Sequence, residues 1–230
     1  MDKITITLDG HSGCGKSTLA KLIAQELDYI YVDTGAMYRA ITYYYLSNGL
    51  LQNNLFIEGW ESHLDSIVLS FEKHKNYNTN VIFLNGECVE HKIRTMQVSS
   101  LVSYVSKQAI IREKLVDFQR FIGKNSGVVM DGRDIGSVVF PNAEIKFWVT
   151  ASARVRAQRR YEEIINSGLS VDFEDVLQNL KDRDFEDSNR KISPLKRPED
   201  SYLVDSSNLT IQQTLNYSMD FINSYFEKKN

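Results

Sequence analysis

A glycine-rich segment near the start of the chain most constrains how it can fold. Residues 10–17 read GHSGCGKS and match G-x-x-x-x-G-K-[ST], a loop whose backbone N–H groups cradle nucleotide phosphates. Residues 4–8 before the loop are strand-like, and residues 17–27 after it place leucine and isoleucine on one helical stripe. This order would point the free N–H groups of the helix start at the phosphates. A flexible glycine turn is the alternative, but the context favours a nucleotide phosphate site.

The same motif predicts roles for individual residues. Its lysine, Lys16, would reach the β- and γ-phosphates, and its final hydroxyl, on Ser17, would ligate Mg²⁺. Cys14 is either a point of oxidative control or a variable loop position, and His11 is interpreted as a variable position. The predicted nucleotide-binding residues are Gly10, His11, Ser12, Gly13, Cys14, Gly15, Lys16, Ser17 and Thr18.

Charge and cysteine content narrow the functional class. The 230-residue chain has a formal net charge of −3, which argues against a general nucleic-acid or membrane binder but allows a local basic cleft. Its two cysteines, Cys14 and Cys88, have no metal-ligand spacing and suit a reducing cytoplasm. No leader-like segment precedes the first strand, and no apolar run reaches the ~20 residues that span a bilayer. We expect a soluble cytoplasmic protein with one domain over residues 1–230.

Strand and helix signals alternate along most of the chain, which predicts an α/β fold with a parallel sheet and helices on both faces. Further strands are predicted at residues 29–32, 127–131, 145–149 and 202–204. Further helices are predicted at 36–46, 98–105, 111–122, 153–165, 172–187 and 211–226. The last helix should open with a capping box formed by Thr210 and Gln213.

The alternation of strand and helix signals stops over residues ~60–95. Residues 67–71, 81–84 and 87–93 are strand-like with no helix between them, and residues 76–80 form a polar turn. Neighbouring strands of this kind do not fit a βαβ core. We therefore predict a small antiparallel insertion beside the main sheet.

Acidic and basic side chains follow the apolar strand that ends near residue 131. In proteins with this loop, a carboxylate at such a strand end organises Mg²⁺, and Asp131 occupies that place; an acidic helix cap is the alternative. Asp131-Gly132-Arg133-Asp134 sets two carboxylates and a guanidinium around a glycine, where open α/β sheets bind ligands. Ser17 and Asp131 are therefore the predicted metal ligands.

Arginines mostly fall in or beside predicted connections and helix ends. Phosphoryl transfer needs many such donors, because catalysis there depends on positioning and charge stabilisation. Residues 154–160 alone could be a solvated basic helix face, whereas an RNA-binding stripe fits poorly because the run lacks aromatic residues. The guanine-reading N-K-x-D element of GTPases is absent. The residues alone therefore predict a kinase of a small phosphate acceptor. The arginines concerned are Arg39, Arg94, Arg112, Arg133, Arg156, Arg159, Arg160, Arg183 and Arg190.

With these motifs in place, the chain closely resembles the bacterial cytidylate kinases, which phosphorylate CMP and dCMP with ATP. The resemblance runs nearly end to end in the family's order, and DTGAMYR and DGRDIG are its most specific segments. The antiparallel stretch at ~60–95 also resembles the family's nucleoside-monophosphate-binding insertion. The matching segments are residues 10–18, 33–39, 93–95, 131–136 and 138–141, Arg183-Asp184, Asp187 with Arg190, and residues 203–207.

The resemblance implies residues for both substrates. Lys16 and the loop amides would hold the phosphates of ATP, and a helical lid over residues 153–170 would close over the transferring group. The predicted catalytic residues are Lys16, Arg133, Arg156, Arg159 and Arg160, the last three in the lid. The predicted acceptor-binding residues are Thr34, Arg39, Ser103, Arg112, Arg133, Asp134, Asp187 and Arg190.

The resemblance also implies which part of the acceptor each of these acceptor-binding residues would contact. Arg39, Arg133 and Arg190 would grip the acceptor phosphate. Asp187 would reach the sugar hydroxyls, and Ser103, Arg112 and Asp134 would read the base, with Thr34 close by.

Base recognition has a physical basis. Cytosine offers an exocyclic amine donor and an N3 acceptor, and uracil presents the reverse pattern. Asp134 would accept from the amine, and Arg112 would donate to N3 and O2. Uracil would leave both groups mismatched, and buried unpaired polar groups cost about 1–3 kcal/mol each. We predict that CMP and dCMP are preferred over UMP.

Other functions remain as alternatives. Kinases of shikimate, adenylate or UMP lack the extra antiparallel stretch and the segment at residues 131–136. A non-catalytic nucleotide- or RNA-binding module would not need Lys16, Ser17, Asp131 and the lid arginines together. The resemblance also favours a monomer with no nucleic-acid or membrane partner.

Overall fold

The computed structural model describes residues 3–75, 80–125, 127–166 and 168–229. Most of the turn expected at residues 76–80, and Ser167 in the predicted lid, lie outside the described residues. The chain divides into two compact units, which are described separately. The first unit comprises Met1–Ile30 and Ser126–Asn230, and the second comprises Tyr31–Asn125.

A parallel sheet forms the centre of the first unit. Its strands lie in the order β10-β9-β1-β8, and β1 pairs with β8 on one side and β9 on the other. Ile6 is opposite Val129 in β8 and Ile145 in β9, and its side chain is fully buried. This central position explains why even the threonines of β1 are buried. The strands are β1 (Thr5–Asp9), β8 (Val128–Gly132), β9 (Ile145–Thr150) and β10 (Tyr202–Asp205).

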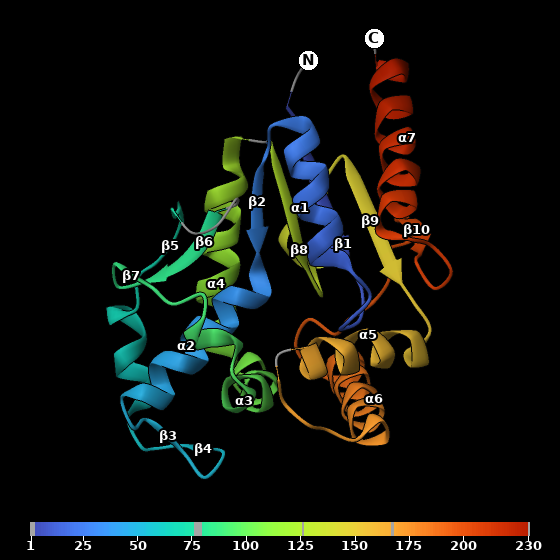
Figure 1. Cartoon of the computed structure of the whole chain (residues 1–230). Helices are drawn as coiled ribbons and strands as arrows, with labels where there is room; N and C mark the ends of the chain where they lie inside the picture. Colours follow the sequence, from blue (N-terminus) through green and yellow to red (C-terminus); the bar gives the residue numbers. More distant parts are fainter. Residues whose placement is uncertain (1–2, 76–79, 126, 167, 230) are drawn as a thin grey trace. The chain divides into compact units, whose positions relative to one another are not determined.

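Helices cover this sheet and extend beyond it. In Figure 1, α1 lies across β8 and β1, and α1 also contacts α7. Helices α5 and α6 pack on one another through a small apolar cluster that includes Ala157, Ile164 and Leu180. The helices of this unit are α1 (Lys16–Leu27), α5 (Ala153–Asn166), α6 (Phe173–Asn189) and α7 (Ile211–Lys229), with a π-helical turn at Ile135–Val139.

The predicted capping box at the start of α7 is confirmed. The backbone N–H of Gln213 donates to Thr210 Oγ1 at 3.2 Å, and the N–H of Thr210 donates to Gln213 Oε1 at 2.9 Å. These reciprocal bonds satisfy donors that the helix start would otherwise leave unpaired.

The second unit combines helices with short antiparallel strands. Strand β6 pairs with β5 and β7 in a three-stranded antiparallel sheet, and β3 pairs with β4. Tyr45 packs edge-on against Phe56 and Trp60 in the core beside the β3–β4 hairpin. The elements are β2 (Ile30–Asp33, entered from the first unit), α2 (Thr34–Ser47), β3 (Leu51–Gln52), β4 (Leu55–Phe56), β5 (Leu69–Lys73), β6 (Asn80–Leu84), β7 (Glu87–Cys88), α3 (Met96–Ser106) and α4 (Ala109–Ile122), with 3₁₀ turns at Trp60–Ser66, Lys92–Arg94 and Gly123–Asn125.

The predicted fold class is confirmed: a parallel sheet flanked by helices, with a small antiparallel sheet. One local prediction is wrong, and one element was not predicted. The strand expected over residues 87–93 ends at Cys88, and a 3₁₀ turn over Lys92–Arg94 follows, in which the N–H of Ile93 donates to the carbonyl of Val89. Ile93 is fully buried in this turn, so its apolar character, taken as a strand signal, reflects core packing. The β3–β4 hairpin was not predicted.

No helix within the described residues combines the length and hydropathy that crossing a bilayer requires.

Candidate active site

The glycine loop connects β1 to α1 in a backbone form that glycine alone tolerates well. Gly10, Gly13 and Gly15 have φ values of 149°, 76° and 87°, all in the positive-φ region that L side chains rarely adopt. A Cβ added at Gly10 would lie 2.0 Å from the carbonyl oxygen of Val149. The loop therefore packs directly on the end of β9, and its conformation requires the motif glycines.

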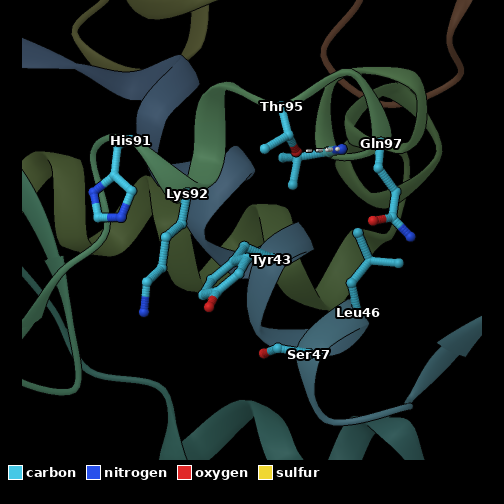
Figure 2. A pocket seen from close by; sticks show the side chains of 8 residues that line it. Tyr43, Leu46, Ser47, His91, Lys92, Thr95 and Gln97 are labelled. Atoms are coloured by element: carbon cyan, nitrogen blue, oxygen red, sulfur yellow. Dashed lines mark hydrogen bonds between the residues drawn. The ribbon is translucent and has the colours of Figure 1, made fainter.

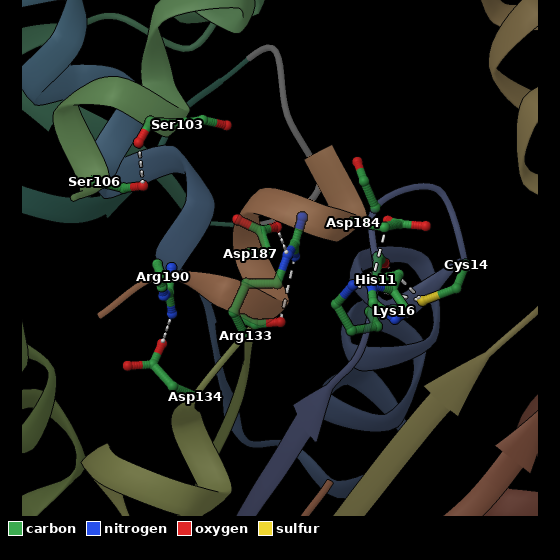
Figure 3. A network of polar contacts seen from close by, with 12 residues as sticks. His11, Cys14, Lys16, Ser103, Ser106, Arg133, Asp134, Asp184, Asp187 and Arg190 are labelled. Carbon is green, nitrogen blue, oxygen red and sulfur yellow. Dashed lines mark hydrogen bonds and ion pairs between the residues drawn. The ribbon is translucent and has the colours of Figure 1, made fainter. Parts of the chain in front are cut away.

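Lys16 is the first residue of α1, and its side chain folds back onto the loop. Its side chain is buried, and Nζ donates to the carbonyl oxygen of His11 at 2.7 Å and lies 3.5 Å from Cys14 Sγ (Figure 3). Burial lowers the pKa of Lys16. A buried ammonium above a loop of N–H groups is an arrangement suited to an anionic ligand.

Ser17 and Asp131, 114 positions apart, meet in the first unit. Ser17 Oγ donates to Asp131 Oδ2 at 2.7 Å, and the Asp131 carboxylate at the end of β8 is buried. A hydroxyl and a carboxylate are hard oxygen donors of the type Mg²⁺ prefers, and Mg²⁺ is commonly held by one or two carboxylates together with phosphates. These residues therefore fit the metal. The described part of the chain contains no cluster of three or more His, Cys, Asp or Glu side chains that could cage a metal by themselves.

Arg156 on α5 contacts both the glycine loop and α6. Its Nη1 and Nη2 lie 3.1 and 2.7 Å from the two carboxylate oxygens of Asp184, and Nη1 also donates to the carbonyl of Ser12 at 3.1 Å. His11 Nδ1 lies 3.2 Å from Asp184 Oδ1 (Figure 3). Although burial works against ionisation, His11 and Arg156 lower the pKa of Asp184. Asp184 thus connects the loop to the predicted lid.

The two other predicted lid arginines differ in environment. Arg159 donates to the hydroxyl and carbonyl oxygens of Ser206 at 3.1 and 2.7 Å, and Ser206 Oγ lies 3.1 Å from the carbonyl of Cys14 in the loop. A Cβ added at Gly15 would lie 3.9 Å from Arg159 Nη1. Arg160 instead is partly exposed and pairs with Glu163 on its own helix at 2.9 Å. The structure therefore brings Arg156 and Arg159, but not Arg160, against the loop.

Two ion pairs join the strand-end segment to α6 and the residues after it. Arg133 Nε donates to Asp187 Oδ2 at 2.8 Å, and Arg190 Nη2 lies 3.3 Å from Asp134 Oδ1 (Figure 3). Burial raises the pKa of Asp187, but Arg133 and the neighbouring Arg190 and Arg183 together lower it below its usual value. All four side chains are largely buried. The first unit therefore pairs two residues of the predicted phosphate set, Arg133 and Arg190, with the predicted sugar and base residues Asp187 and Asp134.

In the second unit, Asp33 organises two arginines at the start of α2. Its carboxylate accepts from the N–H of Ala36 at 2.8 Å, and it pairs with Arg39 at 3.1 Å and Arg94 at 3.0 Å. Burial alone would raise the pKa of Asp33, but the two guanidinium groups lower it to about 2. Thr34 is the first residue of α2 and is buried beside this cluster.

Arg112 and Ser103 share a neighbour in the second unit. Arg112 is 2% exposed, donates to the carbonyl of Ser106 at 3.2 Å and lies 5.4 Å above the ring of Tyr38. Ser106 Oγ donates in turn to the carbonyl of Ser103 at 3.0 Å. The structure therefore places the predicted base-reading residues of this unit at the junction of α3 and α4.

A cavity of about 370 Å³ in the second unit is separate from these residues. Figure 2 shows it between α2 and the segment that precedes α3, with Tyr43 and Lys92 facing one another. None of the predicted site residues lines it. The lining residues are Tyr43, Leu46, Ser47, His91, Lys92, Thr95, Gln97 and Val98.

Comparison with known proteins decides the family. The family model described as "Cytidylate kinase" matches residues 6–224. A cytidylate kinase of Bacteroides fragilis is 48% identical over 220 residues, covering 95% of this chain and 96% of that protein. A cytidylate kinase of Flavobacterium psychrophilum is 47% identical over 225 residues, covering 97% and 100%. This chain belongs to the cytidylate kinase family.

Solved structures agree with the fold. An uncharacterized protein from Eubacterium ventriosum superposes with a TM-score of 0.53 at 13% identity, covering 96% of this chain and 99% of the other. At this identity the likeness concerns the fold alone. The resemblance to the cytidylate kinase family that the motifs predicted is thus confirmed at the level of sequence.

Asp9, Asp33 and Asp184 were not among the predicted site residues. Asp9 ends a strand immediately before the loop, which is the signal that identified Asp131. Asp33 caps α2, a position that acidic residues favour. Asp184 belonged to a segment that matches the family, but its role was not predicted, because its partners His11 and Arg156 lie far away in sequence.

Proposed function

We propose that this chain transfers the γ-phosphoryl group of ATP to CMP and dCMP, giving CDP and dCDP. One observation carries the proposal: a chain of the cytidylate kinase family retains the buried loop lysine Lys16 and the contact between Ser17 and Asp131. A non-catalytic binding module is not favoured, because phosphate binding alone does not need this full set.

The donor side would use the loop and α1. Backbone N–H groups of the loop and the Lys16 ammonium bind the phosphates of ATP, for which the positive-φ glycines and the buried Nζ provide support. Ser17 and Asp131 would hold Mg²⁺. When bound, the metal neutralises the charge on the β- and γ-phosphate oxygens.

On the acceptor side, arginines would bind the phosphate. Arg39, Arg133 and Arg190 bind the acceptor phosphate, since planar guanidinium groups match phosphate oxygens. Carboxylates already orient these arginines, which lowers the entropy lost on binding. Asp187 accepts hydrogen bonds from the sugar hydroxyls.

Base selection would rest on Asp134, Arg112 and Ser103. Asp134 and Arg112 are 4% and 2% exposed, so water cannot readily replace a missing partner. A uracil base would meet Asp134 with an acceptor instead of a donor. Thr34, buried at the start of α2, is proposed as a further neighbour of the substrate.

Transfer would be direct and in line, with no covalent enzyme intermediate. Arg156 and Arg159 stabilise the charge that develops on the transferring group, and their contacts with Ser12 and Ser206 place them against the loop. Arg160 is assigned to the same lid, over residues 153–170, where closure would bring its exposed side chain to the phosphates. Closure would also exclude water, which otherwise hydrolyses ATP.

The cysteines and the net charge bear on where the protein acts and on its partners. We propose a cytoplasmic monomer with small-molecule substrates and no nucleic-acid or membrane partner. The free thiols of Cys14 and Cys88 suit a reducing compartment, and the formal net charge of −3 disfavours polyanions.

The direct mutational test is Lys16→Ala. We expect it to abolish CMP-dependent ADP release with an unchanged far-UV circular dichroism spectrum, because the ammonium binds the transferring phosphates. Lys229→Ala, at the exposed end of α7, is the charge-matched control and should leave turnover unchanged. Wild-type turnover in Lys16→Ala would overturn the mechanism.

A further inference from the structure

Asp9 bridges the end of β1 to the segment that follows Asp134. Its side chain is almost fully buried, Oδ1 accepts from the N–H of Ile135 at 2.8 Å, and Oδ2 accepts from the N–H of Gly136 at 2.7 Å. These two consecutive donors open the π-helical turn Ile135–Val139. One carboxylate therefore satisfies two N–H groups that the start of the turn would leave unpaired.

The contact is close on every side. A Cβ added at Gly136 would lie 2.8 Å from Thr7 Oγ1 and 3.2 Å from Asp9 Oδ2. The backbone at Gly136 therefore lies so close to β1 that a side chain there would crowd these atoms. The Asp134 carbonyl accepts from the N–H groups of Val138 and Val139 at 2.9 and 3.2 Å. The backbone around Asp134 is thus fixed by the turn and by Asp9 together.

Ionisation of this buried acid has an energetic cost. Burial raises the pKa of Asp9 to about 6, and this effect exceeds the opposing effect of its two backbone hydrogen bonds. A carboxyl whose pKa is higher in the folded state than in the unfolded state makes folding less favourable as pH rises from about 4 to 6. At neutral pH the ionised form of Asp9 is therefore less favourable for folding than its protonated form would be, while its two hydrogen bonds fix the local backbone.

We propose that Asp9 is a positioning residue for acceptor specificity, because it holds the N–H groups of Ile135 and Gly136 and so fixes the backbone that presents Asp134 to the base. The inference rests on the proposed role of Asp134. Asp9 also directly precedes Gly10, so it joins the first residue of the phosphate loop to the base-reading segment within the first unit.

The test is Asp9→Asn, which preserves shape but presents one acceptor and one NH₂ donor to two N–H donors. We expect kcat/KM for CMP to fall roughly tenfold or more, mainly through KM for CMP, since the displaced carboxylate is a binding group. The smaller loss for UMP should lower the CMP-to-UMP ratio at least threefold, with KM for ATP within twofold of wild type. Asp220→Asn, on the exposed face of α7, is the control and should change none of these values.

A double-mutant cycle separates positioning from general damage. If Asp9 acts through Asp134, Asp9→Asn should change the CMP-to-UMP ratio little when Asp134→Asn is already present. Gly136→Ala perturbs the same contact from its other side and should lower the ratio as well, which provides the test if Asp9→Asn does not fold.

The outcomes distinguish this inference from the proposed function. A wild-type enzyme without a preference for CMP over UMP would refute the proposed function, and the inference would fall with it. A wild-type preference that Asp9→Asn leaves unchanged would overturn the inference alone. An equal loss of kcat/KM for CMP, UMP and ATP would also overturn it, because that result indicates a purely structural role.

Discussion

Replacing Asp33 by Asn tests how the second unit holds its arginines. Asparagine retains an oxygen that can accept from the N–H of Ala36, so the helix cap can persist. What the substitution removes is the negative charge that pairs with Arg39 and Arg94. The variant therefore isolates the electrostatic contribution of this buried carboxylate.

The size of the effect follows from the pKa of Asp33. Its pKa falls from the usual 3.8 to about 2, because the two arginines outweigh the cost of burial. At 1.36 kcal/mol per pKa unit, a decrease of nearly two units corresponds to roughly 2–3 kcal/mol of stability at neutral pH. Since the folded-state pKa is the lower one, this contribution is complete above about pH 4 and is lost as pH falls toward 2, with about half remaining at pH 3.

The assay is urea unfolding of wild type and Asp33→Asn, followed by far-UV circular dichroism at pH 7, 5 and 3. We expect the difference in the free energy of unfolding to be about 2–3 kcal/mol at pH 7 and 5 and about half that at pH 3. Asp117→Asn, exposed on α4 of the same unit, removes an equal charge and should change stability by less than ~0.5 kcal/mol. A pH-independent difference, or wild-type stability for Asp33→Asn, would refute the electrostatic explanation.

Two further predictions concern the glycine loop. Gly10→Ala should lower the free energy of unfolding by about 2–4 kcal/mol, because the added Cβ would clash with the Val149 carbonyl. Gly86 also has a positive φ but has open space around it, so Gly86→Ala should lower the free energy of unfolding by only about 1 kcal/mol. Equal losses for the two variants in thermal unfolding would contradict the proposed clash. Asp184→Asn should lower the steady-state kcat by roughly tenfold, because Arg156 loses an ionised partner worth about 1.4 kcal/mol. Asp175→Asn, on the exposed face of α6, is the control and should leave kcat unchanged. An unchanged kcat for Asp184→Asn would show that Asp184 does not position Arg156.

Much of the first unit could be predicted because local signals and fold agree there. The glycine motif requires a strand before it and a helix after it, and β1 and α1 occupy those places. The apolar run before Asp131 forms β8, which is buried beside β1. Thr210 and Gln213 form the predicted cap because this interaction needs only neighbouring residues.

The second unit was harder to predict, because its short elements depend on tertiary packing. Asn53 and Asn54 adopt positive φ values and turn β3 into β4, a signal present in the sequence but weaker than Asn-Gly. Ile93 resembles a strand residue by composition, yet it lies in a 3₁₀ turn whose next residue, Arg94, reaches Asp33. That ion pair spans 61 positions, and no local pattern encodes it.

The site could also be predicted from the sequence only where its residues are neighbours in the chain. The loop motif locates Lys16 and Ser17 from eight consecutive residues, whereas Arg133 pairs with Asp187 across 54 positions. Partners of this kind depend on the completed fold. Residue types and the family resemblance could therefore nominate Arg133 and Asp187, but only the structure pairs them.

The central claim is that the acceptor is a cytidine monophosphate, and one measurement tests it most directly. ADP release by the wild-type chain should be followed with ATP and, in turn, CMP, dCMP, UMP and AMP. We predict that CMP and dCMP give the highest kcat/KM, roughly a hundredfold or more above UMP, because two buried groups would be mismatched by uracil at about 1–3 kcal/mol each. Comparable kcat/KM for UMP and CMP would contradict the account.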